Sequence, residues 1–160
     1  MLKMSQRLEY AMRAMIELSF HREQGGEAAL VPAREIAEAQ QIPLRFLEQQ
    51  LGTLGKAGLV ESFRGAGGGC RLARDPAEIR MSDVAEAIEG RWTPMTCLEP
   101  DDHTCFADSR CGLQGFWGDV ALAVQRVFDE TTVADLARRH RTAGPGRTLI
   151  APEQLLSRLS

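Results

Sequence analysis

Apolar residues along the first part of the chain recur at the spacing of helices that bury one face. Over residues 5–21 this spacing predicts an amphipathic helix, and Pro32 suits the start of a short second helix. The Ile42–Pro43 step ends the second helix, because the residue before a proline disfavours helical dihedral angles. A third amphipathic helix follows, with leucines three or four residues apart: Leu44, Leu47, Leu51 and Leu54. Two short helices joined by a tight turn predict a helix-turn-helix, and the exposed side of the second helix is expected to carry Arg45, Glu48, Gln49 and Gln50.

The pattern changes from helical spacing to alternation after Gly58, which is placed to end the third helix. Residues 59–64 alternate apolar and polar side chains, as a half-buried strand does, and residues 70–72 predict a returning strand. The glycine-rich run 65–69 forms the turn between them. A hairpin directly after a helix-turn-helix indicates a wing, the element that enters a DNA groove beside the recognition helix.

A fourth and a fifth helix are expected in the second half of the chain. Ser82 can cap a helix that ends at Gly90. Residues 91–112 contain prolines and cysteines and predict a loop. Residues 113–128 predict a long helix whose apolar face is too rich for a lone surface helix, and this face indicates a dimer contact.

The chain ends in a short helix and a tail. Thr132 and Asp135 suggest a capping box for a helix that reaches about His140. The expected fold is therefore mainly α with a small β-hairpin: a winged helix-turn-helix over residues 1–80 and a cysteine loop with a long C-terminal dimerisation helix over residues 81–141. Residues 142–160 are expected to form a mobile tail.

Composition adds a location and a class of partner. The opening residues carry charges throughout, and no apolar run approaches a membrane span, so we expect a cytoplasmic protein without a membrane partner. The net charge is −3, yet residues 34–74 hold six basic residues against four acidic ones. A locally basic module on an acidic whole is typical of DNA-binding proteins.

The helix-turn-helix and the wing supply candidate contacts to double-stranded DNA. An exposed helix face is otherwise an ordinary solvated surface, but here the turn and the wing flank it as they would in a DNA-binding module. The glycines of the wing let the backbone approach a phosphate, and the arginine at its base suits the negative potential of a narrow groove. The candidates are Arg34, Arg45, Glu48, Gln49, Arg64, Gly67 and Gly68.

Three cysteines indicate a metal or iron–sulfur centre. Cys97, Cys105 and Cys111 are separated by seven and then five residues, an odd number of thiols for a disulfide framework. A reducing compartment also favours metal or redox chemistry over structural disulfides. Zinc is an alternative, since three thiolates with a carboxylate or His103 could make a tetrahedral site. Free loop thiols are the other alternative.

The remaining sequence features indicate no enzyme. Cys70 is interpreted as a small residue of the wing. The glycine run lacks the Gly-Lys-Ser/Thr ending of a phosphate-binding loop and does not open a helix. The sequence also lacks an arrangement of serine, histidine and aspartate that would suggest nucleophilic catalysis.

Several strings closely resemble the IscR/NsrR family of winged-helix regulators over roughly residues 1 to 140. They are LEYAMRAM, then FLEQQLGTLGKAGLVESFRGAGGGCRL, then three cysteines ahead of a long helix. The resemblance implies a homodimer that binds a palindromic operator as a transcription regulator, most often a repressor. It also implies control by an iron–sulfur cluster that senses nitric oxide, redox state or iron–sulfur status.

Two departures from the family bear on the cluster's ligands. The gap between Cys97 and Cys105 is longer than usual in the family, and Gln114 stands where the IscR branch has a histidine. The NsrR branch instead has an acidic residue early in its first helix, which ligates the partner subunit's cluster and corresponds here to Glu9. This resemblance favours [4Fe–4S] over [2Fe–2S].

Other residues and other functions remain open at this point. His103, Asp102 and Asp108 lie inside the cysteine loop and are rivals to Glu9 as the fourth ligand. The alternative function is a cluster-free or zinc-bound winged-helix regulator that responds to thiol oxidation or to a metabolite.

Overall fold

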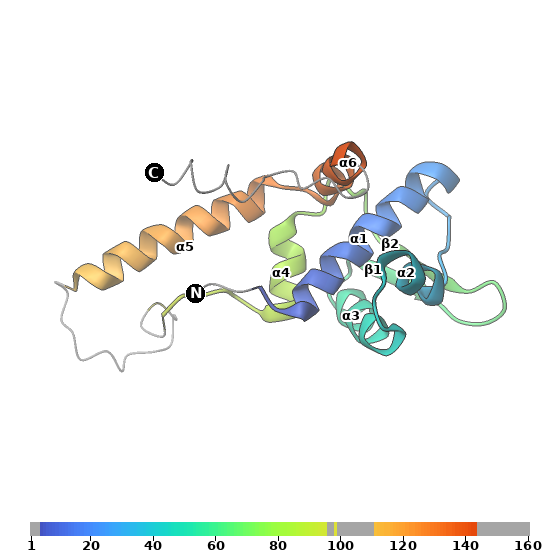
Figure 1. Ribbon diagram of the computed structural model, residues 1–160, viewed down its shortest axis with the longest axis horizontal. Helices are drawn as coiled ribbons and strands as arrows, with labels where there is room; N and C mark the ends of the chain where they lie inside the picture. The colour runs from blue at the N-terminus through green and yellow to red at the C-terminus, as the bar shows by residue number, and fades with distance from the viewer. Residues whose placement is uncertain (1–3, 96–97, 99–110, 144–160) are drawn as a thin grey trace.

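The computed structural model describes residues 4–95, 98 and 111–143 of the chain. In these residues three helices are followed by two strands and then by three more helices (Figure 1). The strands form an antiparallel pair, so the mainly α fold with a small hairpin is confirmed. Among the described helices, none is both long and apolar enough to cross a membrane.

The first helix, α1 (Gln6–Gly25), is the element on which most others pack. Ser5 caps it, because its hydroxyl oxygen accepts a hydrogen bond from the backbone N–H of Leu8 at 3.2 Å. Ala11 and Ala14 are fully buried on its inner face. These two short side chains allow neighbouring elements to approach closely, and α2, α3, α4, α6 and β2 all contact this helix.

The predicted helix-turn-helix is present as α2 (Ala33–Gln40) and α3 (Leu44–Lys56). Gln41 adopts the left-handed conformation between them, with φ of 52°. The backbone N–H of the next residue, Ile42, then donates to the carbonyl of Ala37 at 2.9 Å and closes the turn. The inner face of α3 is buried at the predicted leucines, Leu47, Leu51 and Leu54.

The predicted wing is the hairpin of β1 (Val60–Phe63) and β2 (Gly69–Leu72). Its register pairs Val60 with Leu72, and both side chains belong to the core. The other edge of β2 pairs with Val31, which exchanges two backbone hydrogen bonds with Cys70 at 2.8 and 2.9 Å. A Cβ at Gly69 would lie 2.7 Å from the backbone of Val31, so the close approach requires glycine.

The fourth helix, α4 (Met81–Glu89), begins differently from the prediction. Arg80 stands at its N-cap, and the backbone N–H of Arg80 donates to the carboxylate of Asp83 at 3.0 Å. The expectation that Ser82 caps this helix is wrong. The Ser82 hydroxyl instead hydrogen-bonds to Asp129 of α5 (Gly112–Glu130), and this contact lowers the pKa of Asp129.

The long helix α5 buries none of its residues in the single chain. Figure 1 shows it extending away from the other elements, with only its C-terminal part close to them. Leu113, Phe116 and Val127 are each more than half exposed. The apolar face expected from the sequence is therefore present and uncovered, while the dimer that would cover it stays a prediction.

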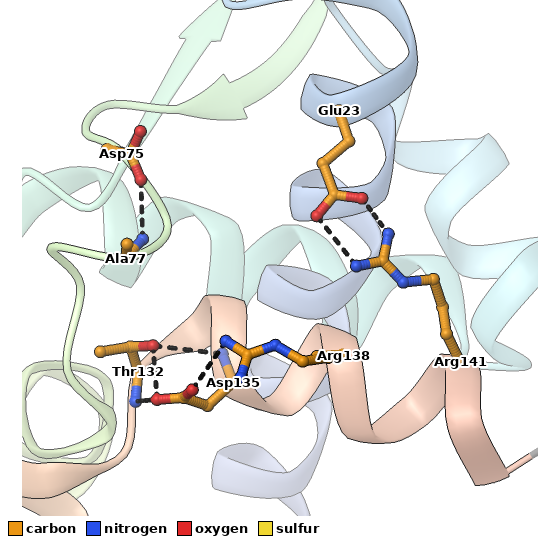
Figure 2. Close-up of polar contacts among 7 residues, drawn as sticks. All are labelled: Glu23, Asp75, Ala77, Thr132, Asp135, Arg138 and Arg141. Carbon is orange, nitrogen blue, oxygen red and sulfur yellow. Dashed lines mark hydrogen bonds and ion pairs between the residues drawn. The ribbon is translucent and has the colours of Figure 1, made fainter.

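The last helix, α6 (Val133–Ala143), returns to α1. The predicted capping box is confirmed: the backbone N–H of Thr132 donates to the Asp135 carboxylate at 3.0 Å, and that of Asp135 donates to the Thr132 hydroxyl at 3.1 Å (Figure 2). At the other end of α6 the Arg141 guanidinium makes an ion pair with Glu23 of α1 (Figure 2). Two residues of α6, Val133 and Ala137, are buried.

The capping box makes the stability of the protein depend on pH. The hydrogen bonds from the backbone and hydroxyl of Thr132 hold the pKa of Asp135 below its usual value of 3.8. A carboxyl whose pKa is lower in the folded state stabilises that state above its unfolded pKa, and this stabilisation is lost as the pH falls through the folded pKa. We therefore expect Asp135→Asn to lower the unfolding temperature near pH 7 and to lower it less near pH 3, below the unfolded pKa.

Thermal unfolding followed by circular dichroism across this pH range measures the difference. Asp119→Asn is the matched control, because it removes the same charge from an exposed position on α5. An Asp135→Asn protein whose deficit is equal at both pH values would show that the carboxylate charge contributes nothing at the cap.

Candidate nucleic-acid interface and cysteine segment

The outer face of α3 carries the polar residues that the sequence predicted to contact DNA. Arg45, Glu48 and Gln49 are all exposed, because the buried leucines hold the opposite side of the helix against the core. Gly52 lies on the same outer face, and a Cβ built there meets nothing within 4 Å. The helix thus offers a polar surface with an open position near its middle.

The structure adds one exposed residue to α3, Phe46, and corrects the prediction for another, Gln50. Phe46, in the first turn, is 53% exposed although it is a large apolar residue. The expectation that Gln50 is exposed is wrong: it is buried, and its side-chain amide donates to the carbonyl of Phe46 at 3.4 Å. The helical period could have predicted the exposure of Phe46, because residue 46 falls outside the stripe of buried leucines.

The wing presents Arg64 immediately after β1, with its side chain exposed. Gly65 and Gly67 have φ of 102° and 78°, values that favour glycine. Glycine is required at position 68 for a different reason: a Cβ there would lie 2.3 Å from the carbonyl oxygen of Phe63. The glycines are therefore explained by the turn, and backbone approach to a phosphate stays a prediction for Gly67 and Gly68.

The outer face of the hairpin holds a cluster of three side chains that the sequence analysis did not identify. The Arg71 guanidinium donates to the Glu61 carboxylate at 2.8 Å and lies 5.0 Å from the centre of the Phe63 ring. Glu61 and Arg71 are directly opposite each other in the register. Paired cross-strand charges and a cation over an aromatic ring stiffen the wing below its glycine tip.

The elements that carry the predicted DNA contacts lie at one end of the molecule. Figure 1 shows α2, α3 and the hairpin there, and the start of α5 at the opposite end. Arg34 is exposed in α2, 4.0 Å from Glu38 of the same helix. The structure thus gathers the predicted DNA-contacting residues, from Arg34 to the wing, into one region.

Of the three cysteines predicted to form a metal centre, Cys111 lies among the residues that the structure describes. Cys97 and Cys105 lie outside the described residues, as do the rival ligands His103, Asp102 and Asp108. Cys111 is the N-cap of α5 and is partly exposed. In residues 4–95, 98 and 111–143, no three His, Cys, Asp or Glu side chains are placed to hold a metal ion.

Glu9 lies in the first turn of α1, and its carboxylate is exposed. Its near neighbour is Arg13, whose guanidinium lies 3.7 Å away. Figure 1 shows the start of α1 well separated from the start of α5, the helix whose N-cap position is Cys111.

Cys70 occupies an interior position of the wing. Its residue is 6% exposed, and its sulfur lies 3.4 Å from the Ser62 hydroxyl on the paired strand. Burial in the core cluster agrees with the interpretation of Cys70 as a small packing residue.

A polar contact joins the beginning of α1 to the end of α4. The Glu89 carboxylate accepts hydrogen bonds from the Ser5 hydroxyl at 2.6 Å and from Arg7 at 3.4 Å. Glu89 is the last residue of α4, after which the chain continues towards the cysteine segment. Ser5, the cap of α1, is therefore bonded to Glu89, which stands just before the predicted cysteine loop of residues 91–112.

The chain matches a protein-family model described as "Rrf2: Iron-dependent Transcriptional regulator" over residues 4–139. It is 31% identical over 137 residues to the HTH-type transcriptional regulator NsrR of Bacillus subtilis strain 168, covering 86% of this chain and 91% of that protein.

Solved structures agree with the match. The structure of T. potens IscR has a TM-score of 0.70 and 32% identity, with 92% of this chain and 94% of that chain covered. The structure of CymR, the global cysteine regulator of B. subtilis, also has a TM-score of 0.70 and 32% identity, with 87% and 98% covered.

Two glycine substitutions test the account of the wing and of α3. Gly69→Ala forces a methyl group against the backbone of Val31, and we expect a loss of about 1–3 kcal/mol of stability. Gly52→Ala meets open space within a helix, and we expect a gain of about 0.5–1 kcal/mol. Urea unfolding curves of both variants measure the two changes, and a shift of the same sign in both would contradict the assignment.

Proposed function

The chain belongs to the Rrf2 family of transcriptional regulators, and from this we propose a cytoplasmic homodimeric repressor whose binding to a palindromic operator is controlled by an iron–sulfur cluster. The observation that carries the DNA-binding part is the exposed outer face of α3, which lies at the same end of the molecule as the hairpin that leads to the exposed Arg64 (Figure 1). Helix-turn-helix proteins place the N-terminal residues of the second helix against base edges in the major groove.

Each predicted contact has a role set by its chemistry. Arg45 can donate to guanine or to a phosphate, and Glu48 can accept from the amino group of cytosine. Arg64 can follow the negative potential of a narrow minor groove. Arg34 and the wing glycines are proposed to contact the phosphate backbone, which positions the protein without specifying sequence.

The proposed cluster ligands are Cys97, Cys105 and Cys111 of one subunit and Glu9 of the other. Cys111 suits this role, because it is partly exposed at a helix start, where backbone N–H groups favour negative charge. The separation of Glu9 from the start of α5 within one chain favours ligation from the partner. When bound, a cluster of this kind supplies a group sensitive to oxidation and nitric oxide, and [4Fe–4S] is favoured over [2Fe–2S].

The chain's own contacts offer a route from the cysteine segment to the DNA-binding end. Glu89 holds Ser5 and Arg7 at the start of α1, and α1 contacts both α2 and α3. A change at the start of α1 can therefore alter the position of the recognition helix. A coupling free energy of about 1–3 kcal/mol is enough to change operator affinity roughly 5–150-fold.

Anaerobic purification with iron and sulfide counts tests the cluster. We expect about four irons per subunit, with loss of iron or altered absorption in Glu9→Ala. Glu130→Ala, which removes an exposed carboxylate from α5, is the matched control and should keep the native iron content. A cluster of unchanged absorption and lifetime in Glu9→Ala would remove Glu9 from the ligand set. Equal operator affinity of the protein with and without iron would contradict control by the cluster.

Arginine substitutions test the DNA interface on an operator duplex. Arg45→Ala and Arg64→Ala should each cost about 1–3 kcal/mol of binding free energy if the side chain contacts a base or groove. A phosphate contact would instead weaken binding to all sequences alike and reduce its salt dependence. Arg126→Ala, an exposed position on α5, should leave the affinity unchanged. Native affinity in both interface variants would contradict the proposed orientation.

The likeness to CymR, a global cysteine regulator, supports a second candidate function. In this version the same winged helix binds DNA, and the cysteines respond to thiol oxidation or bind zinc without an iron–sulfur cluster. A colourless protein without acid-labile sulfide that still binds a palindrome would favour this candidate.

A further inference from the structure

An aromatic ring stands uncovered at the end of α3 where recognition helices meet base edges. Phe46 is the third residue of the helix and is 53% exposed. Its backbone is fixed at both polar atoms: the N–H donates to the carbonyl of Pro43 at 2.9 Å, and the carbonyl accepts from Gln50 at 3.4 Å. The ring is therefore presented outward from a well-anchored position.

The other exposed phenylalanine near this end of the molecule differs from Phe46. Phe63 lies under the guanidinium of Arg71, which covers one face of its ring at 5.0 Å. Within the described part of the chain, no aromatic ring or guanidinium stacks on Phe46. Its exposed surface is thus left without the kind of cover that the protein provides for Phe63.

The neighbours of Phe46 indicate what kind of molecule would cover it. Arg45 precedes it, and Gln49 lies one turn further along the exposed side of α3. Both side chains suit base edges and phosphates, whereas a protein partner would favour a larger apolar surface around the ring. The surroundings therefore favour DNA over a second protein chain.

A phenylalanine ring has no hydrogen-bonding group, so in the major groove it can recognise an apolar feature only. The 5-methyl group of thymine is the apolar group that the four bases display there. We propose that Phe46 determines specificity by packing against the methyl group of a thymine in the operator. This inference rests on the proposed DNA-binding function and adds to it a base that the polar residues of α3 do not select.

Removal of the methyl group alone tests the contact. The probe is a duplex selected by the full-length protein from a random library, in which each thymine is replaced in turn by deoxyuridine. At the contacted position we expect the native protein to lose about fourfold in affinity, the effect of uncovering one methyl group. Phe46→Ala should bind the thymine and deoxyuridine duplexes equally at that position and lose sensitivity at no other.

Two further variants keep the result interpretable. Phe46→Leu retains an apolar side chain and should keep part of the methyl sensitivity, even if Phe46→Ala binds too weakly to measure. Leu122→Ala removes another exposed apolar side chain, on α5, and should keep the full sensitivity of the native protein at the same thymine.

The outcomes separate this inference from the function on which it rests. Failure to select any duplex would contradict DNA binding itself. Selection of a duplex with equal deoxyuridine effects in the native and Phe46→Ala proteins would overturn the role of Phe46 alone. Loss of the dimer in Phe46→Ala, measured by sedimentation, together with unchanged methyl sensitivity, would instead assign the ring to a protein contact.

Discussion

The described structure depends on the burial of one face of α1. Its two alanines, Ala11 and Ala14, are fully buried, and they let helices from both halves of the chain approach the same surface. The recognition helix α3 packs there, and so do α4 and α6, which flank the cysteine segment and α5 in the sequence. One helix therefore sets the position of the DNA-binding end relative to the rest of the chain. Because a close-packed interior transmits small displacements, a movement of α1 reaches every element that contacts it.

Much of the fold follows from local patterns that the structure satisfies. Leucine spacing predicted α3, alternation predicted the hairpin, and the Thr132–Asp135 pair predicted the start of α6, because each signal depends on residues close in sequence. The cap of α4 was missed for the opposite reason. Ser82 has the right chemistry for a cap, but its hydroxyl is taken by Asp129, which is 47 residues away and which no local pattern connects to it.

The candidate site divides in the same way. Arg45, Glu48 and Gln49 could be placed outward from the helical period alone, since their exposure follows from the burial of the leucines. The exposure of Phe46 follows from the same period, although it runs against the usual preference of aromatic residues for the core. The pairing of Arg71 with Glu61 depends on the hairpin register, and the separation between the starts of α1 and α5 depends on how distant parts of the chain pack.

The uncovered face of α5 has a consequence for how the protein depends on its own concentration in the cell. If the proposed homodimer covers this face, the order of α5 rises with the concentration of subunits, because none of its residues is fully buried in the single chain. Cys111 occupies the N-cap position of this helix, so the position of its backbone would depend on the same equilibrium. For a homodimer, halving the number of subunits at low occupancy removes about three quarters of the assembled species by mass action. Gene dosage would then change the amount of such a dimer more steeply than the amount of its subunits.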